Sequence, residues 1–175
     1  MLNPDNEGLY TNIGITFKNK GKLSEAIKVY QKVLASKPNN ALAYYYIGIA
    51  LQEQGKYIEA INAFNKSLVL KPNQAKVYND MGAALITQGK IDDAVSNYYK
   101  SLTLDPYYAD AYNNLGVALR NKGELDNAIQ AYKKALDLKP NCVEVLDNLG
   151  VALQNQGKLD EALEAYNKAL SLKPD

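Results

Sequence analysis

The chain has 175 residues, of which 47% are hydrophobic and 22% charged, as in an ordinary folded protein. A net charge of +1 excludes the strong global field of a nucleic-acid-binding or anionic-membrane-binding protein, and no apolar run approaches the ~18 residues of a transmembrane helix. The chain lacks histidine, the commonest general base and metal ligand, and its one cysteine, Cys142, excludes an intrachain disulfide. One thiol and the absence of a basic-then-apolar leader favour a cytoplasmic location.

Prolines and glycines recur along the chain with a period of 34 residues. All six prolines follow this period, and ten of the eleven glycines form two further series with the same spacing. A fixed period of this size predicts stacked supersecondary units. The prolines are Pro4, Pro38, Pro72, Pro106, Pro140 and Pro174.

In chain order, the period separates a short leading segment from five units. Residues 1–6 have the phase of the last turn of a unit and are interpreted as the remnant of a preceding repeat. The last unit ends directly after its second predicted helix, without a capping helix. We therefore interpret the chain as a segment of a longer array. The five units are residues 7–40, 41–74, 75–108, 109–142 and 143–175.

The unit from residue 109 illustrates the predicted structure, a pair of helices of roughly 14 residues each joined by a tight turn. Apolar residues recur with helical spacing over residues 109–123 and again over 125–140. Gly123 stops the first helix, and Asp126 lies where it would cap the second helix or act as a first-turn acid. Gly116 lies inside the first helix at a cost of roughly 1 kcal/mol, which predicts a close approach of the partner helix backbone.

These residues resemble the tetratricopeptide repeat, a family with a 34-residue period. The resemblance implies an all-α fold: a right-handed superhelical solenoid of five helix–turn–helix repeats, with about ten antiparallel helices. It further implies a protein–protein interaction scaffold. The matching residues of the fourth unit are Tyr112, Leu115, Gly116, Ala128, Tyr132, Ala135 and Pro140.

In this family the first helix of each repeat lines a concave groove that holds the ligand. Of the positions implied here, Tyr45 and Tyr46 are expected to expose their rings, and Ile15 and Ile49 to make that end apolar. Asp147 and its acidic neighbours are expected at the other end. The predicted ligand is therefore apolar at one end and basic at the other. The candidate groove residues are Asn12, Ile15, Tyr45, Tyr46, Ile49, Lys76, Asn79, Asp80, Asn113, Asn114, Arg120, Asp147 and Asn148.

One phase of this set resembles the asparagine ladder in the repeats of O-linked N-acetylglucosamine transferases. An amide both donates and accepts hydrogen bonds, so a ladder of amides pairs with a peptide backbone of any sequence. Two of the five positions, Tyr46 and Asp80, depart from asparagine. Asparagine as a simple filler at this position explains the pattern equally well. The phase comprises Asn12, Tyr46, Asp80, Asn114 and Asn148.

Two other functions stay open beside the scaffold. The array could recruit substrates for a larger enzyme such as a glycosyltransferase, or it could bind RNA as a helical repeat. No catalytic residue, metal ligand set or cofactor motif is recognisable in the chain itself. The expected partner is a protein or peptide rather than nucleic acid or membrane. Apolar faces expected on the first and last helices also favour head-to-tail self-association.

Overall fold

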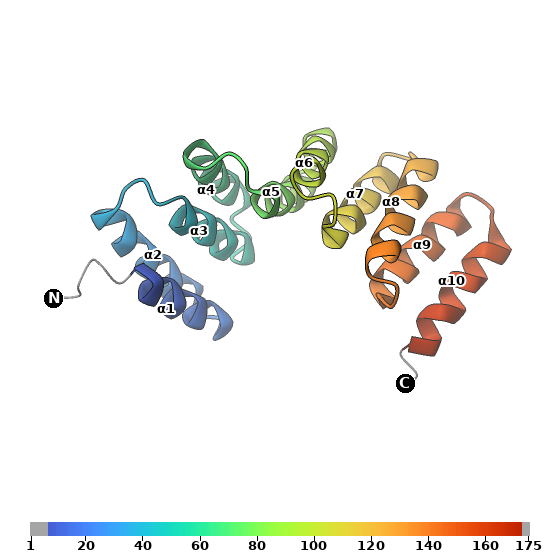
Figure 1. The fold of residues 1–175 in the computed structure, drawn as a ribbon, viewed down its shortest axis with the longest axis horizontal. Coiled ribbons are helices and arrows are strands. Elements are labelled where there is room, and N and C mark those ends of the chain that lie inside the picture. Colours follow the sequence, from blue (N-terminus) through green and yellow to red (C-terminus); the bar gives the residue numbers. More distant parts are fainter. Residues whose placement is uncertain (1–6, 173–175) are drawn as a thin grey trace. The chain divides into compact units, whose positions relative to one another are not determined.

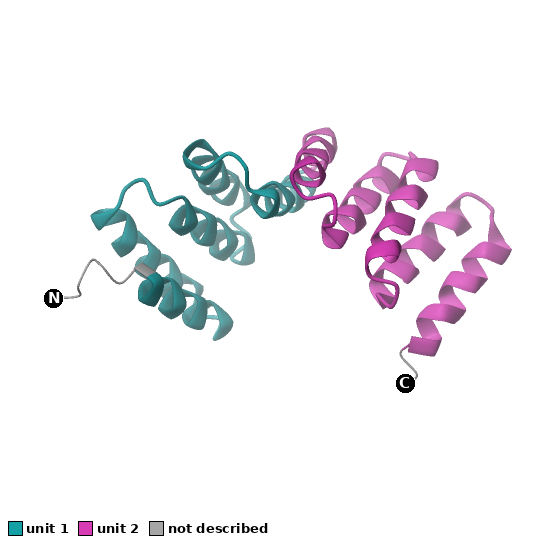
Figure 2. Ribbon diagram, in the orientation of Figure 1, with its two compact units in different colours: residues 1–88 teal, residues 89–175 magenta. Residues whose placement is uncertain are grey.

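The computed structural model describes residues 7–172, which fold into α-helices and connecting turns (Figure 1). The chain divides into two compact units, residues 1–88 and 89–175 (Figure 2). The helices alternate between 13 and 14 residues, close to the predicted length. The remnant proposed for residues 1–6 lies outside the described residues. Unit 1 contains α1 (Glu7–Asn19), α2 (Leu23–Ser36), α3 (Ala41–Glu53), α4 (Tyr57–Leu70) and α5 (Ala75–Thr87). Unit 2 contains α6 (Ile91–Leu104), α7 (Ala109–Asn121), α8 (Leu125–Leu138), α9 (Val143–Asn155) and α10 (Leu159–Leu172).

Within each unit, helices that follow one another along the chain pack side by side. In unit 1, α1 packs on α2 and α3 on α4, while α2 packs on α3 and α4 on α5. In unit 2, the same relation joins α6 with α7, α7 with α8, α8 with α9 and α9 with α10. Both units therefore have the predicted all-α helical repeat fold.

The turn between α7 and α8 shows how the sequence ends one helix and starts the next. Gly123 has a φ of 80°, a left-handed conformation that glycine adopts without steric cost. Its backbone N–H donates to the carbonyl of Arg120, which satisfies one of the open carbonyls at the end of α7. Asp126 does not cap α8, because the N-cap residue is Glu124; it is instead an acid in the first turn.

In the helix pairs α1–α2, α3–α4, α7–α8 and α9–α10, an aromatic ring of the second helix lies against a glycine of the first. A Cβ added to Gly116 would lie 2.5 Å from Cε1 of Tyr132, and one added to Gly48 would lie 2.5 Å from Cε1 of Phe64. Glycine is therefore needed at these positions because a side-chain ring fills the space. The sequence predicted a close approach of the partner helix backbone at these glycines, and this was wrong: the close contact is with a side-chain ring. The fully buried rings are Tyr30, Phe64, Tyr98 and Tyr132.

Among residues 7–172, no helix is both long enough and apolar enough to span a bilayer.

Candidate functional site

All the candidate groove residues lie on the first helices of the repeats, and in unit 1 these helices are α1, α3 and α5. Asn12 and Ile15 come from α1, the first exposed and the second half-buried. Ile49 on α3 is also half-buried, and Lys76 on α5 is exposed.

Tyr45 is buried rather than exposed, which corrects the expectation of an aromatic anchor at this position. Its side chain is only 6% exposed, and its ring lies 6.2 Å from that of Phe64. Lys76 Nζ lies 6.0 Å from the ring centroid. The ring therefore stabilises the packing of α3 and is too covered to serve as a binding anchor.

Tyr46 is half-buried and stacks on the fully buried ring of Tyr30. The two ring centroids lie 5.4 Å apart with an interplanar angle of 14°. The ring of Tyr45 lies 5.2 Å from that of Tyr46, so the three tyrosines form one aromatic cluster across α2 and α3. Only Tyr46 in this cluster keeps part of its ring at the surface.

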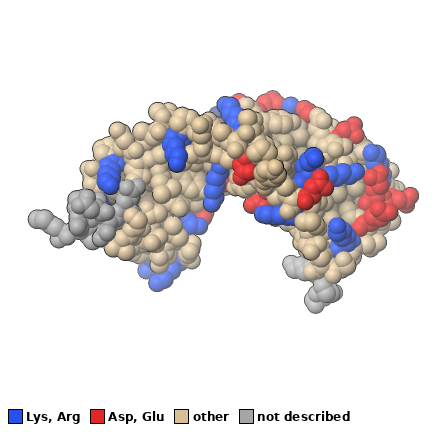
Figure 3. All heavy atoms as spheres, viewed as in Figure 1, with Lys and Arg blue, Asp and Glu red and all other residues tan. Residues whose placement is uncertain are grey.

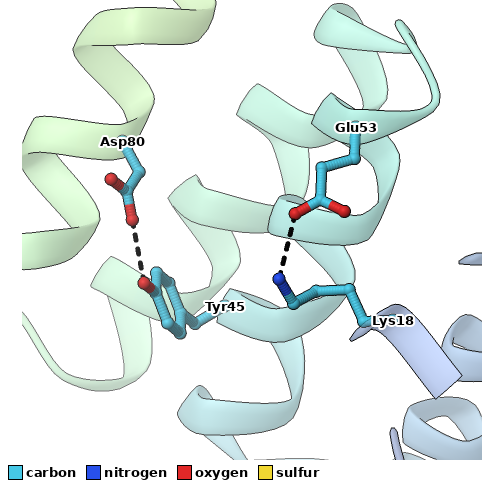
Figure 4. Close-up of polar contacts among 4 residues, drawn as sticks. All are labelled: Lys18, Tyr45, Glu53 and Asp80. Atoms are coloured by element: carbon cyan, nitrogen blue, oxygen red, sulfur yellow. Dashed lines mark hydrogen bonds and ion pairs between the residues drawn. The ribbon is translucent and has the colours of Figure 1, made fainter. Parts of the chain in front are cut away.

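Asp80 lies against this cluster and accepts two hydrogen bonds (Figure 4). The Tyr45 hydroxyl donates to Oδ2 at 2.8 Å, and Asn79 Nδ2 donates to Oδ1 at 3.0 Å. Burial raises the pKa of the Asp80 carboxyl, while the bonds from Tyr45 and Asn79 and the charge of Lys76 oppose that rise. Asp80 is therefore a structural hydrogen-bond acceptor. It stands at a position where the asparagine ladder would have asparagine, and its local partner there is Tyr45.

A second pair crosses from α1 to α3 in unit 1. Lys18 Nζ lies 3.1 Å from Glu53 Oε1 (Figure 4). The two side chains are 25% and 43% exposed, so this ion pair is a weak surface contact. An exposed pair of this kind adds little to the stability of the fold.

In unit 2 the groove residues lie on α7 and α9, where a hydrogen-bonded polar strip connects the two helices. Asn148 Nδ2 donates to Asn113 Oδ1 at 3.1 Å, and Asn113 Nδ2 donates to Glu144 Oε1 at 3.0 Å. Asn113 is buried, whereas Asn148 and Asn114 are half-buried. We call Asn113, Asn114 and Asn148 the amide strip.

Charged groups border the amide strip. Asp147 and Glu144 are exposed on α9, and Arg120 is half-buried on α7. Asp110 accepts from Lys139 Nζ at 2.6 Å, so its charge is largely compensated. Glu144 and Asp147 therefore give this surface its acidic character.

One spacing relates most of these contacts. The pairs Lys18–Glu53, Tyr45–Asp80 and Asn113–Asn148 are each 35 residues apart. A first-helix side chain thus meets the residue one repeat plus one position further along. The sequence placed Tyr45, Asp80, Asn113 and Asn148 on one surface but did not reveal their pairing. The 35-residue spacing is the signal that would have revealed it.

No group of three or more potential metal-ligating side chains occurs within the described part of the chain.

Two family models match the sequence. The tetratricopeptide repeat model matches residues 41–74, 109–142 and 146–175. A second model, described as a TPR repeat, matches residues 16–55 and 84–123. No curated protein sequence matches the chain.

Several solved structures are similar to the chain. The crystal structure of MamA protein has a TM-score of 0.82 at 32% identity, covering 95% of this chain and 91% of that chain. A MamA structure from Desulfovibrio magneticus RS-1 has a TM-score of 0.86 at 28% identity, covering 95% and 94%. YrrB, described as a TPR protein with an unusual peptide-binding site, has a TM-score of 0.77 at 25% identity, covering 95% and 86%.

Proposed function

Since the chain belongs to the tetratricopeptide repeat family and has the fold of a protein–protein interaction scaffold, we propose that it binds an extended peptide along α7 and α9. The amide strip is the observation that carries this proposal. Asn148 already donates to Asn113 across the two helices, and Asn113 donates to Glu144, so these side chains are held in place before a ligand arrives. An amide donates and accepts at once, which suits the repeating N–H and C=O groups of a peptide backbone.

The charges beside the amide strip define the ligand further. Glu144 and Asp147 are exposed, so a basic segment of the ligand suits unit 2. In unit 1, half-buried Ile15, Ile49 and Tyr46 offer an apolar surface for an apolar segment. Asn12 and Lys76 in unit 1 and Arg120 in unit 2 complete the proposed set. Asp80 is left out of it, because its carboxylate accepts from Tyr45 and Asn79.

The similarity to YrrB supports a peptide as the ligand, because that relative is described as having a peptide-binding site. We propose a scaffold without catalytic activity of its own, in which no residue is assigned a catalytic role. The expected self-association is a separate proposal, because it concerns surfaces of α1 and α10.

Peptides selected from a random display library against the full chain provide the probe for the experiment. Affinity is measured by fluorescence anisotropy for the wild type, for Asn148→Ala and for Asn114→Ala. Each replacement is expected to weaken binding by about 1–2 kcal/mol, because it removes hydrogen bonds to the peptide backbone. The matched control is Gln130→Ala, an exposed amide on α8. Equal affinities for all four proteins would reject the amide strip as the binding site.

A further inference from the structure

α10 and α9 present an open apolar hollow in unit 2. It has a volume of about 600 Å³, and nearby Leu163 on α10 is 58% exposed. The acidic side chains of Glu144 and Asp147 form part of its wall. The hollow is lined by Val143, Glu144, Asp147, Tyr166, Ala169 and Leu170.

The same surface one repeat earlier is covered by a helix. The residues 34 positions before this lining lie on α7 and α8, and α9 packs against both of these helices. Four of these six residues are therefore buried: Ala109 is 5% exposed, Tyr132 and Ala135 are 0% exposed, and Asn113 is 6% exposed. Of the other two, Leu136 is half-buried and Asp110 is exposed. The α9–α10 surface thus has the form of a site for a helix that resembles α9.

α1 is such a helix, and its corresponding face is also open. A hollow of about 370 Å³ lies along α1. Leu9 is 54% exposed, whereas Val145, which is in the same phase on α9, is 4% exposed. The α1 hollow is lined by Leu9, Asn12, Ile13, Thr16, Phe17 and Lys20.

A polar contact recurs at three of the four places where one repeat of a unit packs on the next. At the fourth, between α4 and α5, the equivalent positions hold Ile58 and Gln88. Lys122 Nζ lies 2.9 Å from Asp92 Oδ1, and these residues are 30 positions apart. Gln156 Nε2 donates to Asp126 Oδ1 at 2.6 Å across the same separation. In unit 1, Gln54 and Ser24 hold these positions, and Gln54 Nε2 lies 3.2 Å from Ser24 Oγ.

Lys20 and Asp160 are the residues of this phase on the two open surfaces. Lys20 occupies the same position in its repeat as Lys122, and Asp160 occupies the same position as Asp92. Both are exposed. If α1 of one copy lies on α9 and α10 of another, Lys20 meets Asp160 as Lys122 meets Asp92.

A second polar contact extends in the same way. Adjacent first helices pair residues 35 positions apart, as Tyr45 with Asp80 and Asn113 with Asn148. If α1 of one copy follows α9 of another as the next first helix, the same pairing places Asn12 of the first copy opposite Asp147 of the second. The Asn12 amide would donate to the exposed Asp147 carboxylate. Asp147 lines the hollow at α9 and α10, and Asn12 lines the hollow along α1, so this bond forms at the edge of the apolar contact.

The charges of the two halves are also complementary. Residues 1–88 contain ten Lys and Arg against six Asp and Glu, a net charge of +4, and residues 89–175 contain ten against thirteen, a net charge of −3. Figure 3 shows acidic side chains mostly over unit 2. Opposite net charges favour contact between unlike surfaces of two copies over contact between like surfaces.

We infer that the occupant of the α9–α10 surface is α1 of a second copy of this chain. The apolar residues Leu9, Ile13 and Phe17 fill the hollow between α9 and α10, while Lys20 and Asn12 pair with Asp160 and Asp147. Because the two surfaces differ, the contact is heterologous and adds copies head to tail. Free energy comes mainly from the apolar contact, and the charged pair sets its direction.

Sedimentation of the full chain over a range of concentrations and salt tests this inference. We expect association that rises with concentration and weakens with salt. Lys20→Asp and Asp160→Lys should each raise the dissociation constant about 3- to 10-fold. An equimolar mixture of the two variants should recover an association between unlike molecules. Lys32→Asp and Asp137→Lys are the controls, because they make the same charge changes at other exposed positions.

A chain that stays monomeric at every concentration would overturn the inference. Association that neither charge reversal weakens would also overturn it. So would two variants that each fail to associate and that still fail to associate when they are mixed. Asn12 and Asp147 belong to both proposals, so peptide affinity is measured at a chain concentration too low for association. Under that condition it should not change in Lys20→Asp or Asp160→Lys, because neither of these residues belongs to the proposed groove. Failure of the self-association and failure of the peptide proposal are therefore distinguishable.

Discussion

The Tyr45 hydroxyl donates a hydrogen bond of 2.8 Å to Asp80 Oδ2 and so connects α3 with α5. This bond replaces, in unit 1, the contact that Asn113 and Asn148 make between α7 and α9 in unit 2. Equivalent positions thus serve two purposes. In unit 1 they hold aromatic packing together, and in unit 2 they leave the amide of Asn148 half-buried beside the buried amide of Asn113.

Asp80 should make the stability of the chain depend on pH. Burial raises its folded-state pKa, so its contribution to stability is fully present below the unfolded pKa and is lost as pH rises through the folded pKa. The free energy of unfolding of the wild type relative to Asp80→Asn should therefore fall as pH rises above about 4, the ordinary pKa of an aspartate, as urea unfolding would measure. A rise over this range would mean that the bonds from Tyr45 and Asn79 outweigh burial.

Tyr45→Ala should destabilise the chain before it affects any ligand. Because the ring is 6% exposed and packs near Phe64, its removal should cost about 3–5 kcal/mol of unfolding free energy. Tyr45→Phe keeps the ring and loses the bond to Asp80, at about 1–3 kcal/mol. Chemical unfolding of both variants separates packing from hydrogen bonding. A stable Tyr45→Ala variant would contradict the buried position of the ring.

Gly116→Ala should destabilise the chain by about 1–3 kcal/mol, because the added Cβ would lie 2.5 Å from the Tyr132 ring. Gly8→Ala is the matched control. A Cβ there meets nothing within 4 Å, and alanine favours a helix by roughly 1 kcal/mol over glycine. Thermal unfolding should therefore move in opposite directions for the two variants. A gain in stability at Gly116 would show that the ring has room to move.

Tyr132→Phe should change stability by less than about 1 kcal/mol at neutral pH, since the Tyr132 hydroxyl has no hydrogen-bond partner within the described residues. Phe64 in the same phase shows that the phenyl ring fits. Burial raises the pKa of Tyr132 to about 12, so its neutral form is favoured in the fold. The wild type should lose stability relative to the variant as pH rises from about 10 to 12. Parallel loss in both proteins would assign the alkaline sensitivity to other groups.

The repeat fold was predictable because each helix must bury one face at every 34-residue step. Proline, glycine and the apolar spacing mark the helix ends, so α7 and α8 begin at the residues expected from the sequence. The same spacing could not decide which of two adjacent tyrosines, Tyr45 or Tyr46, faces the core. Tyr45 and Tyr46 are about 100° apart around α3, and the sequence alone does not show that Tyr45 turns toward α5.

The candidate site was predictable as a surface but not as a set of contacts. Helical phase placed Asn113, Asn148 and Asp80 on first helices, as observed. Which side chains meet depends on the offset between adjacent first helices, which only the packed structure provides. That offset makes the pairs 35 residues apart rather than 34.

Nuclear magnetic resonance of the full chain with a library-selected peptide tests the central claim most directly. The side-chain amide resonances of Asn114 and Asn148 should shift on titration, while that of Gln130 on α8 should not. This outcome would place the peptide along α7 and α9 through their amides. Shifts confined to α8 and α10, with both asparagine resonances unmoved at saturation, would contradict the proposed function.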